Sequence, residues 1–450
     1  MSITSVIPSS PTCLRPDRQR GRASQSARRA RAMSLLKASA VSAIGAGIKL
    51  LFGLLLIKVV ANSLGPSGLG LMGQLMSMTT ILVLLAGGGI ATGVVKYVAE
   101  YREAPVRLHE FLSAARGYSL IASLILLIVG LLVAQPLALW IFKEPGYGYI
   151  VYILSFAQLG IAINTFALAV VGGYKDVVTS NVVSTVGSLL GVLALVLLIY
   201  CFGNTGMLIG LTALPALPVL ISLWIVRKKY PEVLRRRFWI NKRDTRLLFR
   251  FSLMMAASAI TMPVAQMLLR SHLVDQFGWT QVGYLQATIR LSDAYLLFVN
   301  MVLAGYYMPK LSELGPGRQQ LRYMMDAMTR LLPLVAVCIA IIWLLGTPLI
   351  SLLFSEEFLP ARELLTYQLI GDFFKIGSFI MGYVVVANAW LRLSILGDIV
   401  QATLFFSLAW YQSSHYGMLG VSIGYAVCYI VYFAALSALF YRSWRIQINE

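Results

Sequence analysis

Charged residues are scarce in this chain of 450 residues. Asp, Glu, Lys and Arg together make up 12% of it, whereas soluble domains carry about a quarter. Hydrophobic residues make up 58%, and the mean hydropathy is +0.78. Apolar runs of about 20 residues, long enough to cross a hydrocarbon core of about 30 Å, recur along the whole chain. The composition excludes an ordinary soluble domain and predicts an all-α polytopic membrane protein.

Cysteine and histidine are also rare, with four and three residues. No two cysteines are spaced as in CxxC and no two histidines as in HxxxH, so we expect neither a disulfide framework nor a metal site. The HExxH zinc motif and Walker-type glycine loops are missing as well. We therefore expect a protein without a cofactor, whose energy comes from an ion gradient, the membrane potential or downstream consumption of its cargo.

Acidic residues are half as common as basic ones, 18 against 37, and the net charge is +19. On a soluble surface this excess would suggest nucleic acid, but here Lys and Arg lie between apolar runs. If the N-terminus is cytoplasmic, Lys143 and Arg362 are the only Lys or Arg in the outer loops, as the positive-inside rule requires. We expect both termini to be cytoplasmic and no nucleic acid partner.

Twelve membrane-spanning helices are predicted from the apolar runs. Their ranges are 38–62, 68–95, 115–142, 149–172, 178–201, 205–226, 248–272, 282–308, 322–346, 364–387, 392–411 and 417–440. This pattern divides the chain into an N-terminal six-helix bundle (33–226), a basic cytoplasmic linker (227–247) and a C-terminal six-helix bundle (248–450).

The two predicted bundles repeat one another in sequence. LGPSGLGLMGQL from Leu64 resembles FGWTQVGYLQAT from Phe277, and their glycines keep one offset, since 278 − 65 and 283 − 70 both equal 213. PLALWIFKEP resembles PLISLLFSEE at an offset of 212, and Gly-Met-Leu recurs at an offset of 211. These matches fall after equivalent spans, so the halves relate by a pseudo-two-fold axis along the membrane normal, an architecture typical of transporters.

Two basic segments allow two interpretations each. Residues 1–32 are rich in Arg and lack the apolar core of a signal peptide, so they are either a disordered leader or the product of a misassigned start, with translation beginning at Met33. The segment 227–250 is either an amphipathic helix on the anionic inner leaflet or a loop that fixes topology.

Three prolines within the spans are candidate hinges. Pro215 and Pro218 lie in the sixth span and Pro263 in the seventh. Proline removes a backbone hydrogen bond and can kink a helix, which would allow one bundle to rock against the other. The alternative is that these residues only permit close helix packing.

Ionisable side chains within the spans are the candidate site residues, because each costs at least ~2.5 to 3.5 kcal/mol at the membrane centre. They are Lys49, Lys58, Arg270, His272, Arg290, Asp293, Asp372, Lys375 and Asp398. The cations outnumber the acids, which predicts an anionic cargo.

The position of each charge refines this prediction. Lys49 lies in the middle of its span and is expected to face a cavity, whereas Lys58 lies about 180° around the same helix and could instead extend to the headgroups. Arg270, near the outer end of its span, either snorkels or lines the mouth of the cavity. Asp398 lies close to an inner loop and is expected to cap a helix.

Two pairs of opposite charge are spaced by three residues and so share a helix face. Arg290 precedes Asp293, and Asp372 precedes Lys375. Each pair could be a structural pair that neutralises itself, or its acid could take part in proton or substrate handling.

Several longer motifs resemble one known family. They are MSLLKAS from Met33, LGPSGLGLMG, GVVKYVAEY from Gly93, TMPVAQMLLR ending at Arg270, LSDAYLLF from Leu291, YQLIGDFFKIGSFIMGY from Tyr367 and YIVYF from Tyr429. Together they resemble the Wzx flippases of the multidrug/oligosaccharidyl-lipid/polysaccharide exporter superfamily, most closely those of enterobacterial common antigen synthesis. The resemblance covers nearly the whole chain from Met33 onward.

This resemblance implies a V-shaped, alternating-access fold in the bacterial inner membrane. It implies movement of an undecaprenyl pyrophosphate-linked trisaccharide to the outer leaflet, and a polymerase and chain-length regulator as partners besides membrane lipids. It also implies Lys49, Lys58 and Arg270 as contacts of the pyrophosphate or a sugar acid, with Asp293, Asp372 and Lys375 as supporting or coupling groups. Arg290, a further candidate substrate contact, departs from the family pattern.

Three other functions remain open from the sequence. An O-antigen repeat-unit flippase would share the fold and the chemistry. A cation-coupled multidrug exporter would also share the fold, but cationic drugs favour acidic sites and the balance of charge here is the reverse. A glycan polymerase or ligase would need a large outer loop for its acceptor, and the predicted outer loops are short.

Overall fold

The computed structural model describes residues 18–231 and 241–448, and within these ranges the chain forms helices and no strand. The N-terminal half contains α1 (Arg18–Leu85), η1 (Ala86–Gly88), α2 (Ala91–Tyr101), α3 (Pro105–Leu132), α4 (Ala134–Phe142), η2 (Pro145–Tyr147), α5 (Gly148–Gly173), α6 (Val177–Ala213), η3 (Leu214–Ala216) and α7 (Pro218–Lys229).

The C-terminal half contains α8 (Lys242–Ala259), α9 (Thr261–Val302), η5 (Leu303–Tyr307), α10 (Met308–Leu314), α11 (Arg318–Leu344), α12 (Gly346–Leu353), η6 (Glu356–Phe358), α13 (Ala361–Ala387) and α14 (Leu391–Ile448). Eight helical segments of the described chain are long and apolar enough to cross a membrane, and four of these contain 42 to 54 residues. A single crossing needs about 20 residues, so each of these four holds two crossings. The total, 8 + 4, is the predicted twelve.

Glycines make the turns inside the four long segments. Gly65 in α1 (φ 64°, ψ −165°) and Gly278 in α9 (φ 75°, ψ 170°) adopt one conformation. Gly203 in α6 (φ 56°, ψ −131°) and Gly417 in α14 (φ 60°, ψ −145°) share another. Residues with a side chain rarely adopt a positive φ, which is why glycine recurs at these turns. Equivalent turns in the two halves confirm the predicted duplication.

The halves pack most closely where α1 crosses α9. A Cβ built on Gly70 would lie 2.7 Å from the carbonyl oxygen of Trp279, and one on Gly283 would lie 1.9 Å from that of Pro66. Gly70 and Gly283 are related by the offset of 213, as are Pro66 and Trp279, so the same contact is made twice about the pseudo-two-fold axis. Only glycine allows backbones to approach this closely.

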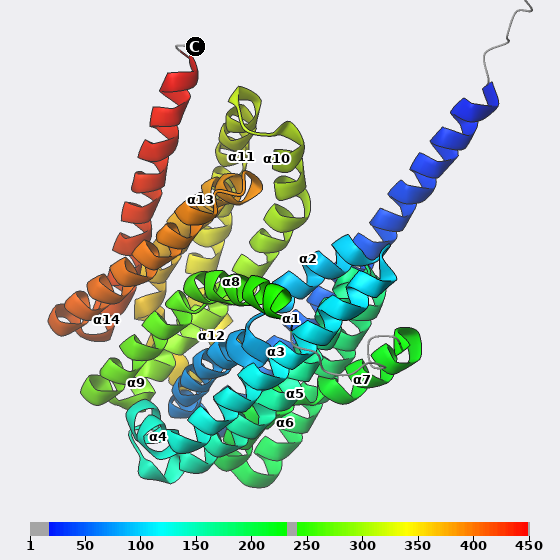
Figure 1. Ribbon diagram of the computed structural model, residues 1–450. Coiled ribbons are helices and arrows are strands. Elements are labelled where there is room, and N and C mark those ends of the chain that lie inside the picture. The colour runs from blue at the N-terminus through cyan, green and yellow to red at the C-terminus, as the bar shows by residue number, and fades with distance from the viewer. Residues whose placement is uncertain (1–17, 232–240, 449–450) are drawn as a thin grey trace, which may run out of the picture.

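The molecule is V-shaped (Figure 1). The start of α1 and the end of α14 lie at one end of the molecule, where the two halves diverge, and the halves meet at the opposite end. At the joined end Lys143 forms an ion pair of 2.7 Å with Asp275, and Ser271 donates a 3.0 Å hydrogen bond to the carbonyl of Trp140. These residues lie in or beside the loops that the sequence places outside, so this conformation is joined at the predicted outer end.

A second connection lies toward the predicted inner end, where α8 crosses the N-terminal half. The carboxylate of Asp244 is 1% exposed and accepts hydrogen bonds of 2.5 and 2.9 Å from both terminal nitrogens of Arg107 in α3. Ser252 of α8 donates to the carbonyl of Gly88 and accepts from Tyr118 at 3.2 Å. The first helix of the C-terminal half is therefore anchored on the other half.

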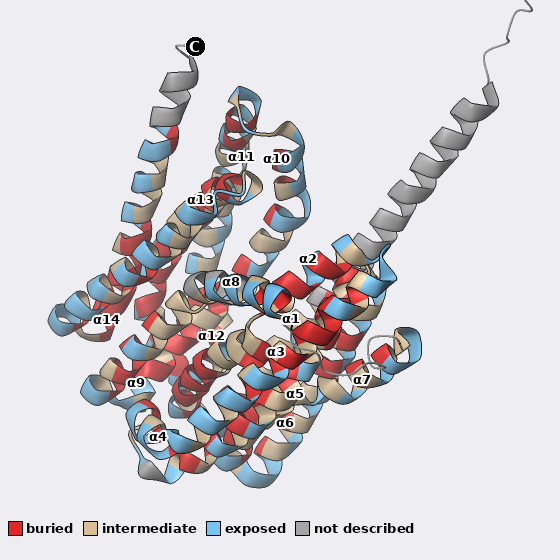
Figure 2. Ribbon diagram, viewed as in Figure 1, coloured by how far each residue is buried: buried red, intermediate tan, exposed pale blue. Residues whose placement is uncertain are grey.

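Figure 2 shows that buried residues lie mainly where helices pack together and exposed residues on the outward faces. Many of the exposed residues are large and apolar. In α11, Leu334, Val337, Ile341 and Leu344 are 51 to 73% exposed. Apolar surface this continuous is unfavourable in water but is matched by lipid chains.

The leader, the linker and the hinge prolines fall at distinct places. Residues 18–32 form the first part of α1, while residues 1–17, the rest of the leader, and residues 232–240, the middle of the linker, lie outside the described residues. Pro215 lies in the 3₁₀ turn between α6 and α7, and Pro218 is the first residue of α7. Pro263 is the third residue of α9, just after the break that follows α8. All three prolines thus lie at helix breaks, and their role as hinges stays a prediction.

Candidate substrate site

Two arginines of α9 reach across the interface between the halves. Arg270 is 4% exposed and donates a 2.6 Å hydrogen bond from Nη1 to Oγ of Ser77 in α1. Arg290 contacts Sδ of Met76 at 3.0 Å and forms an ion pair of 3.1 Å with Asp293. The two arms of α9, on either side of the turn at Gly278, thus place guanidinium groups against adjacent residues of α1.

A small cavity of about 50 Å³ lies beside Arg270. Arg270, Asp293 and Lys375 line it, together with Gln266 and Gln368. A water molecule occupies about 30 Å³ of liquid, so the cavity is too small for a diphosphate or a sugar. The structure brings three predicted site residues together around a small space.

Asp372 lies at the centre of a buried polar cluster beside this cavity. It is 0% exposed and accepts hydrogen bonds from the hydroxyls of Ser292 and Tyr425, both at 2.6 Å, and from Tyr295. Nζ of Lys375 donates to Oη of Tyr425 at 3.2 Å. The predicted common face of Asp372 and Lys375 is confirmed, with the hydroxyl of Tyr425 linking the ammonium to the carboxylate.

The tyrosines of this cluster were missed by the sequence prediction. The ammonium of Lys375 lies 5.5 Å from the ring centre of Tyr425 and 5.3 Å from that of Tyr429, within range of cation–π attraction. Tyr425 and Tyr429 are one helical turn apart in α14, and this spacing was the available signal. This spacing could not reveal that both tyrosines contact Lys375, because Lys375 lies on another helix, α13.

Lys49 and Lys58 lie away from this cluster. Nζ of Lys49 lies 2.5 Å from Oγ of Ser184 in α6, a contact within the N-terminal half, and Lys58 is exposed. Both precede the turn at Gly65, whereas the α1 residues that meet Arg270 and Arg290 follow it. In this conformation the structure gathers Arg270, Arg290, Asp293, Asp372 and Lys375, but not the two lysines of the first span.

Two further candidate residues lie outside this cluster. Asp398, expected to cap a helix, lies inside α14 and lines a separate cavity, because α14 already begins at Leu391. His272 stacks on Trp410, with ring centres 3.5 Å apart. Neither belongs to the cluster around Asp372.

The site has the chemistry of an anion receptor. Three cations face two carboxylates, which leaves a formal excess of one positive charge at membrane depth. Guanidinium groups offer several N–H donors in a fixed plane that matches phosphate oxygens. In the part of the chain that the structure describes, no three His, Cys, Asp or Glu side chains cluster as metal ligands would. The pattern GVSIG, typical of a hydrolase serine, occurs from Gly420, but it lies within helix α14 and Ser422 is fully buried.

Twelve crossings in two equivalent halves, joined at one end over a buried cationic site, define an alternating-access membrane transporter. The chain belongs to the polysaccharide biosynthesis protein family, whose profile matches residues 35–314. It is 36% identical over 415 residues to the lipid III flippase of Escherichia coli (strain K12), covering 92% of this chain and 99% of that one. The lipid III flippase of Shigella flexneri matches equally well.

Two solved structures share the fold. An inward closed conformation of the lipid II flippase MurJ superposes with a TM-score of 0.72 at 15% identity, over 88% of this chain and 86% of that one. An inward-facing multidrug resistance MATE transporter of the MOP superfamily superposes with a TM-score of 0.68 at 19% identity, over 89% and 98%. At these identities the likeness establishes the alternating-access fold of the superfamily and nothing finer.

Proposed function

We propose that this protein is a flippase that moves lipid III, the undecaprenyl pyrophosphate-linked trisaccharide repeat of enterobacterial common antigen, from the inner to the outer leaflet of the bacterial inner membrane. The observation that carries this proposal is the 36% identity to a lipid III flippase over nearly the full length of both chains. The O-antigen repeat-unit flippase remains the alternative, since it would require the same fold and the same head-group chemistry.

The charge of the site supports a phosphate-bearing cargo. A diphosphate carries about two negative charges at neutral pH, and it would replace its water with the donors of Arg270, Arg290 and Lys375. A cation-coupled drug exporter would need an excess of acids at this place, and the described cluster has an excess of cations. The polyprenyl tail stays in lipid while the head crosses, which lets a small protein move a large molecule.

The contacts suggest how access alternates. With both termini in the cytoplasm, this conformation is closed outside by the Gly70–Gly283 contact and by the hydrogen bond from Arg270 to Ser77. A head group that arrives from the inner leaflet would compete with Ser77 for the guanidinium of Arg270. Release of that bond would weaken the outer closure and favour the outward-open state. Lys49 and Lys58 would then be contacts of the open cavity.

Two finer points belong to the same proposal. The protein acts without covalent chemistry on its cargo, and the polymerase and chain-length regulator of the same glycan are its partners in the membrane. Asp293, Asp372 and Lys375 support Arg270 and Arg290 by fixing charge and hydrogen bonds around them.

Complementation tests the proposal. The full chain and a version beginning at Met33 would be expressed in a strain that lacks its lipid III flippase, and surface antigen and accumulated lipid-linked intermediate would be measured. Restored antigen together with loss of the intermediate is the expected result. If the protein inserts in the membrane without restoring antigen, the lipid III assignment is wrong, and restoration in a strain that lacks an O-antigen flippase would support the alternative.

A further inference from the structure

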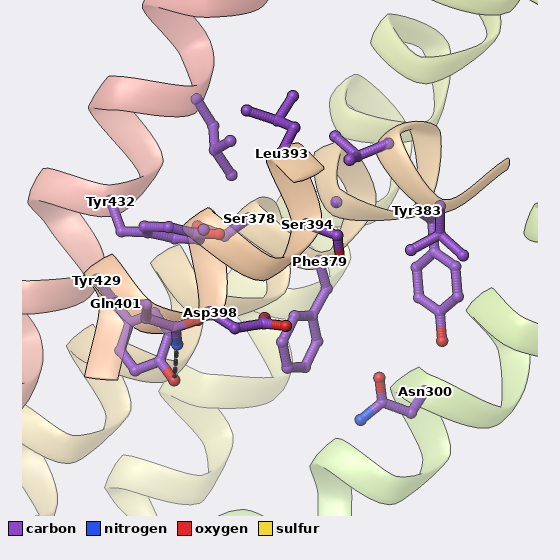
Figure 3. A pocket seen from close by; sticks show the side chains of 15 residues that line it. Asn300, Ser378, Phe379, Tyr383, Leu393, Ser394, Asp398, Gln401, Tyr429 and Tyr432 are labelled. Atoms are coloured by element: carbon purple, nitrogen blue, oxygen red, sulfur yellow. Dashed lines mark hydrogen bonds between the residues drawn. The ribbon is translucent and has the colours of Figure 1, made fainter. Parts of the chain in front are cut away.

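A second, larger cavity of about 360 Å³ lies within the C-terminal half (Figure 3). Its walls come from the end of α9 with Asn300, from α13 with Ser378 and Tyr383, and from α14 with Asp398 and Gln401. All these residues lie in the predicted inner halves of their spans. The cavity therefore lies at the depth where a head group from the inner leaflet would first enter the protein.

Aromatic rings and hydrogen-bonding groups both line this cavity, together with several aliphatic side chains. Figure 3 shows the carboxylate of Asp398 pointing toward Phe379, with Tyr432 and Gln401 on one side and Asn300 on the other. Other cavities of the same half differ, since the one between α11 and α14, of about 650 Å³, is lined largely by Leu, Met and Phe side chains. Lipid chains suit that lining, whereas a carboxylate and two amides at membrane depth indicate a polar ligand.

The polar wall is held in place by the cluster around Lys375. Nε2 of Gln401 donates a 2.7 Å hydrogen bond to Oη of Tyr429, and the ring of Tyr429 lies against the ammonium of Lys375. A carboxamide fixed in this way is preorganised to bind a ligand. The cavity and the cationic cluster thus share one tyrosine as a common wall.

We propose that this cavity is a subsite for an uncharged sugar of the lipid-linked glycan. This inference rests on the proposed function, because it takes the glycan as the occupant. Asp398 is the only ionisable group other than tyrosine among the lining residues, so the cavity repels phosphate, which the nearby cations attract. Carboxylate and carboxamide groups bind pairs of sugar hydroxyls, and the apolar face of a sugar ring packs on aromatic rings.

Gly382 offers a direct test. It lines the cavity, and a Cβ built on it meets no atom within 4 Å, so the side chain of Gly382→Leu has room to start in the cavity and would reduce its volume. Gly191 of α6 is the matched control, because a Cβ there also meets nothing within 4 Å and Gly191 does not line this cavity. Asn300→Ala is a second variant, which removes an amide and leaves the cavity open.

The experiment measures binding to the purified full chain in lipid nanodiscs. The probes are undecaprenyl pyrophosphate bearing the trisaccharide and undecaprenyl pyrophosphate alone. We expect wild type and Gly191→Leu to bind the glycosylated lipid at least about tenfold more tightly than the bare one, as one or two hydrogen bonds allow. Gly382→Leu should abolish that preference and Asn300→Ala should reduce it several-fold, both with unchanged affinity for the bare lipid.

Four results would overturn the subsite. Gly382→Leu could keep the preference for the glycosylated lipid, or weaken the binding of both lipids equally. Tetraphenylphosphonium could bind wild type and not Gly382→Leu, which would make the cavity a site for organic cations. Wild type that binds neither lipid would contradict the proposed function itself, whereas wild type that binds both equally would contradict only the subsite.

Discussion

Arg270 of α9 and Ser77 of α1 are joined by a 2.6 Å hydrogen bond that connects the two halves at a buried position. The bond helps to hold the outer end closed, and its donor is also one of the few cations at membrane depth. Opening of the outer end must break it, which frees the guanidinium at the step where a head group would pass.

Substitution of Arg270 tests this double role. Arg270→Ala should reduce restored surface antigen about 10- to 100-fold, because a charge-assisted hydrogen bond contributes about 1.5–3 kcal/mol. Arg270→Lys should restore an amount of antigen between those of wild type and Arg270→Ala, because lysine keeps the charge but not the planar set of donors. Ser77→Ala is the control that removes only the bond between the halves. Equal losses for Ser77→Ala and Arg270→Ala would contradict a role in substrate binding.

The glycine contact between α1 and α9 should control closure of the outer end. In Gly283→Ala the new methyl group has no room beside the carbonyl of Pro66, so the outer end should open. Disulfide formation between cysteines introduced at Lys143 and Asp275, in a background free of native cysteines, reports the distance there. We expect slower cross-linking in Gly283→Ala. The control is Gly305→Ala, where a Cβ meets nothing within 4 Å, and slowing in that variant too would argue against the contact.

The cluster around Asp372 should behave as one energetic unit. Asp372→Ala leaves the ammonium of Lys375 buried without its compensating carboxylate, a change that typically costs about 3–5 kcal/mol. Thermal unfolding of the purified protein should show a lower Tm for Asp372→Ala. Adding Lys375→Ala should recover part of the loss. If the decrease in Tm of the double variant equals the sum of the decreases of the two single variants, the two charges are not coupled.

The turn between α5 and α6 predicts a dependence of stability on pH. Burial raises the pKa of Asp176, but hydrogen bonds from Lys229, Thr179 and Tyr230 outweigh it and lower the pKa to about 2, from an ordinary 3.8. Because the folded pKa lies below the unfolded one, the carboxylate stabilises the fold above the unfolded pKa and stops doing so as the pH falls through the folded one.

The measurement is the difference in Tm between wild type and Asp176→Asn as a function of pH. It should be constant from about pH 7 to about pH 5 and shrink as the pH falls from about 4 toward 2. A difference that already declines between about pH 7 and about pH 5 would contradict the lowered pKa.

The architecture was predictable because its signals are local and repeated. Apolar runs of about 20 residues gave the twelve crossings, and the offset of 213 between Gly70 and Gly283 gave the two equivalent halves. The same offset joins the turns at Gly65 and Gly278. The sequence did not reveal that the two repeated glycines touch one another, because a repeat fixes equivalence and not contact.

Contacts between site residues were predictable only where both residues lie on one helix. The spacing of three residues gave the ion pair of Arg290 with Asp293, which is confirmed at 3.1 Å. The link from Lys375 through Tyr425 to Asp372 joins α13 to α14, and no spacing within a helix encodes such a pairing. Lys49 was expected to face a cavity because of its depth. In this conformation it contacts Ser184, and its role in a cavity stays a prediction.

Transport by the purified protein tests the central claim most directly. Vesicles would carry the trisaccharide-linked undecaprenyl pyrophosphate in one leaflet, and a membrane-impermeant reagent that oxidises sugars would report how fast the glycan leaves it. We predict that wild type accelerates this loss of accessibility, that Arg270→Ala does so about 10- to 100-fold more slowly, and that the lipid-linked glycan is chemically unchanged. Equal rates in wild-type and protein-free vesicles, or a new covalent product, would contradict the assignment as a flippase.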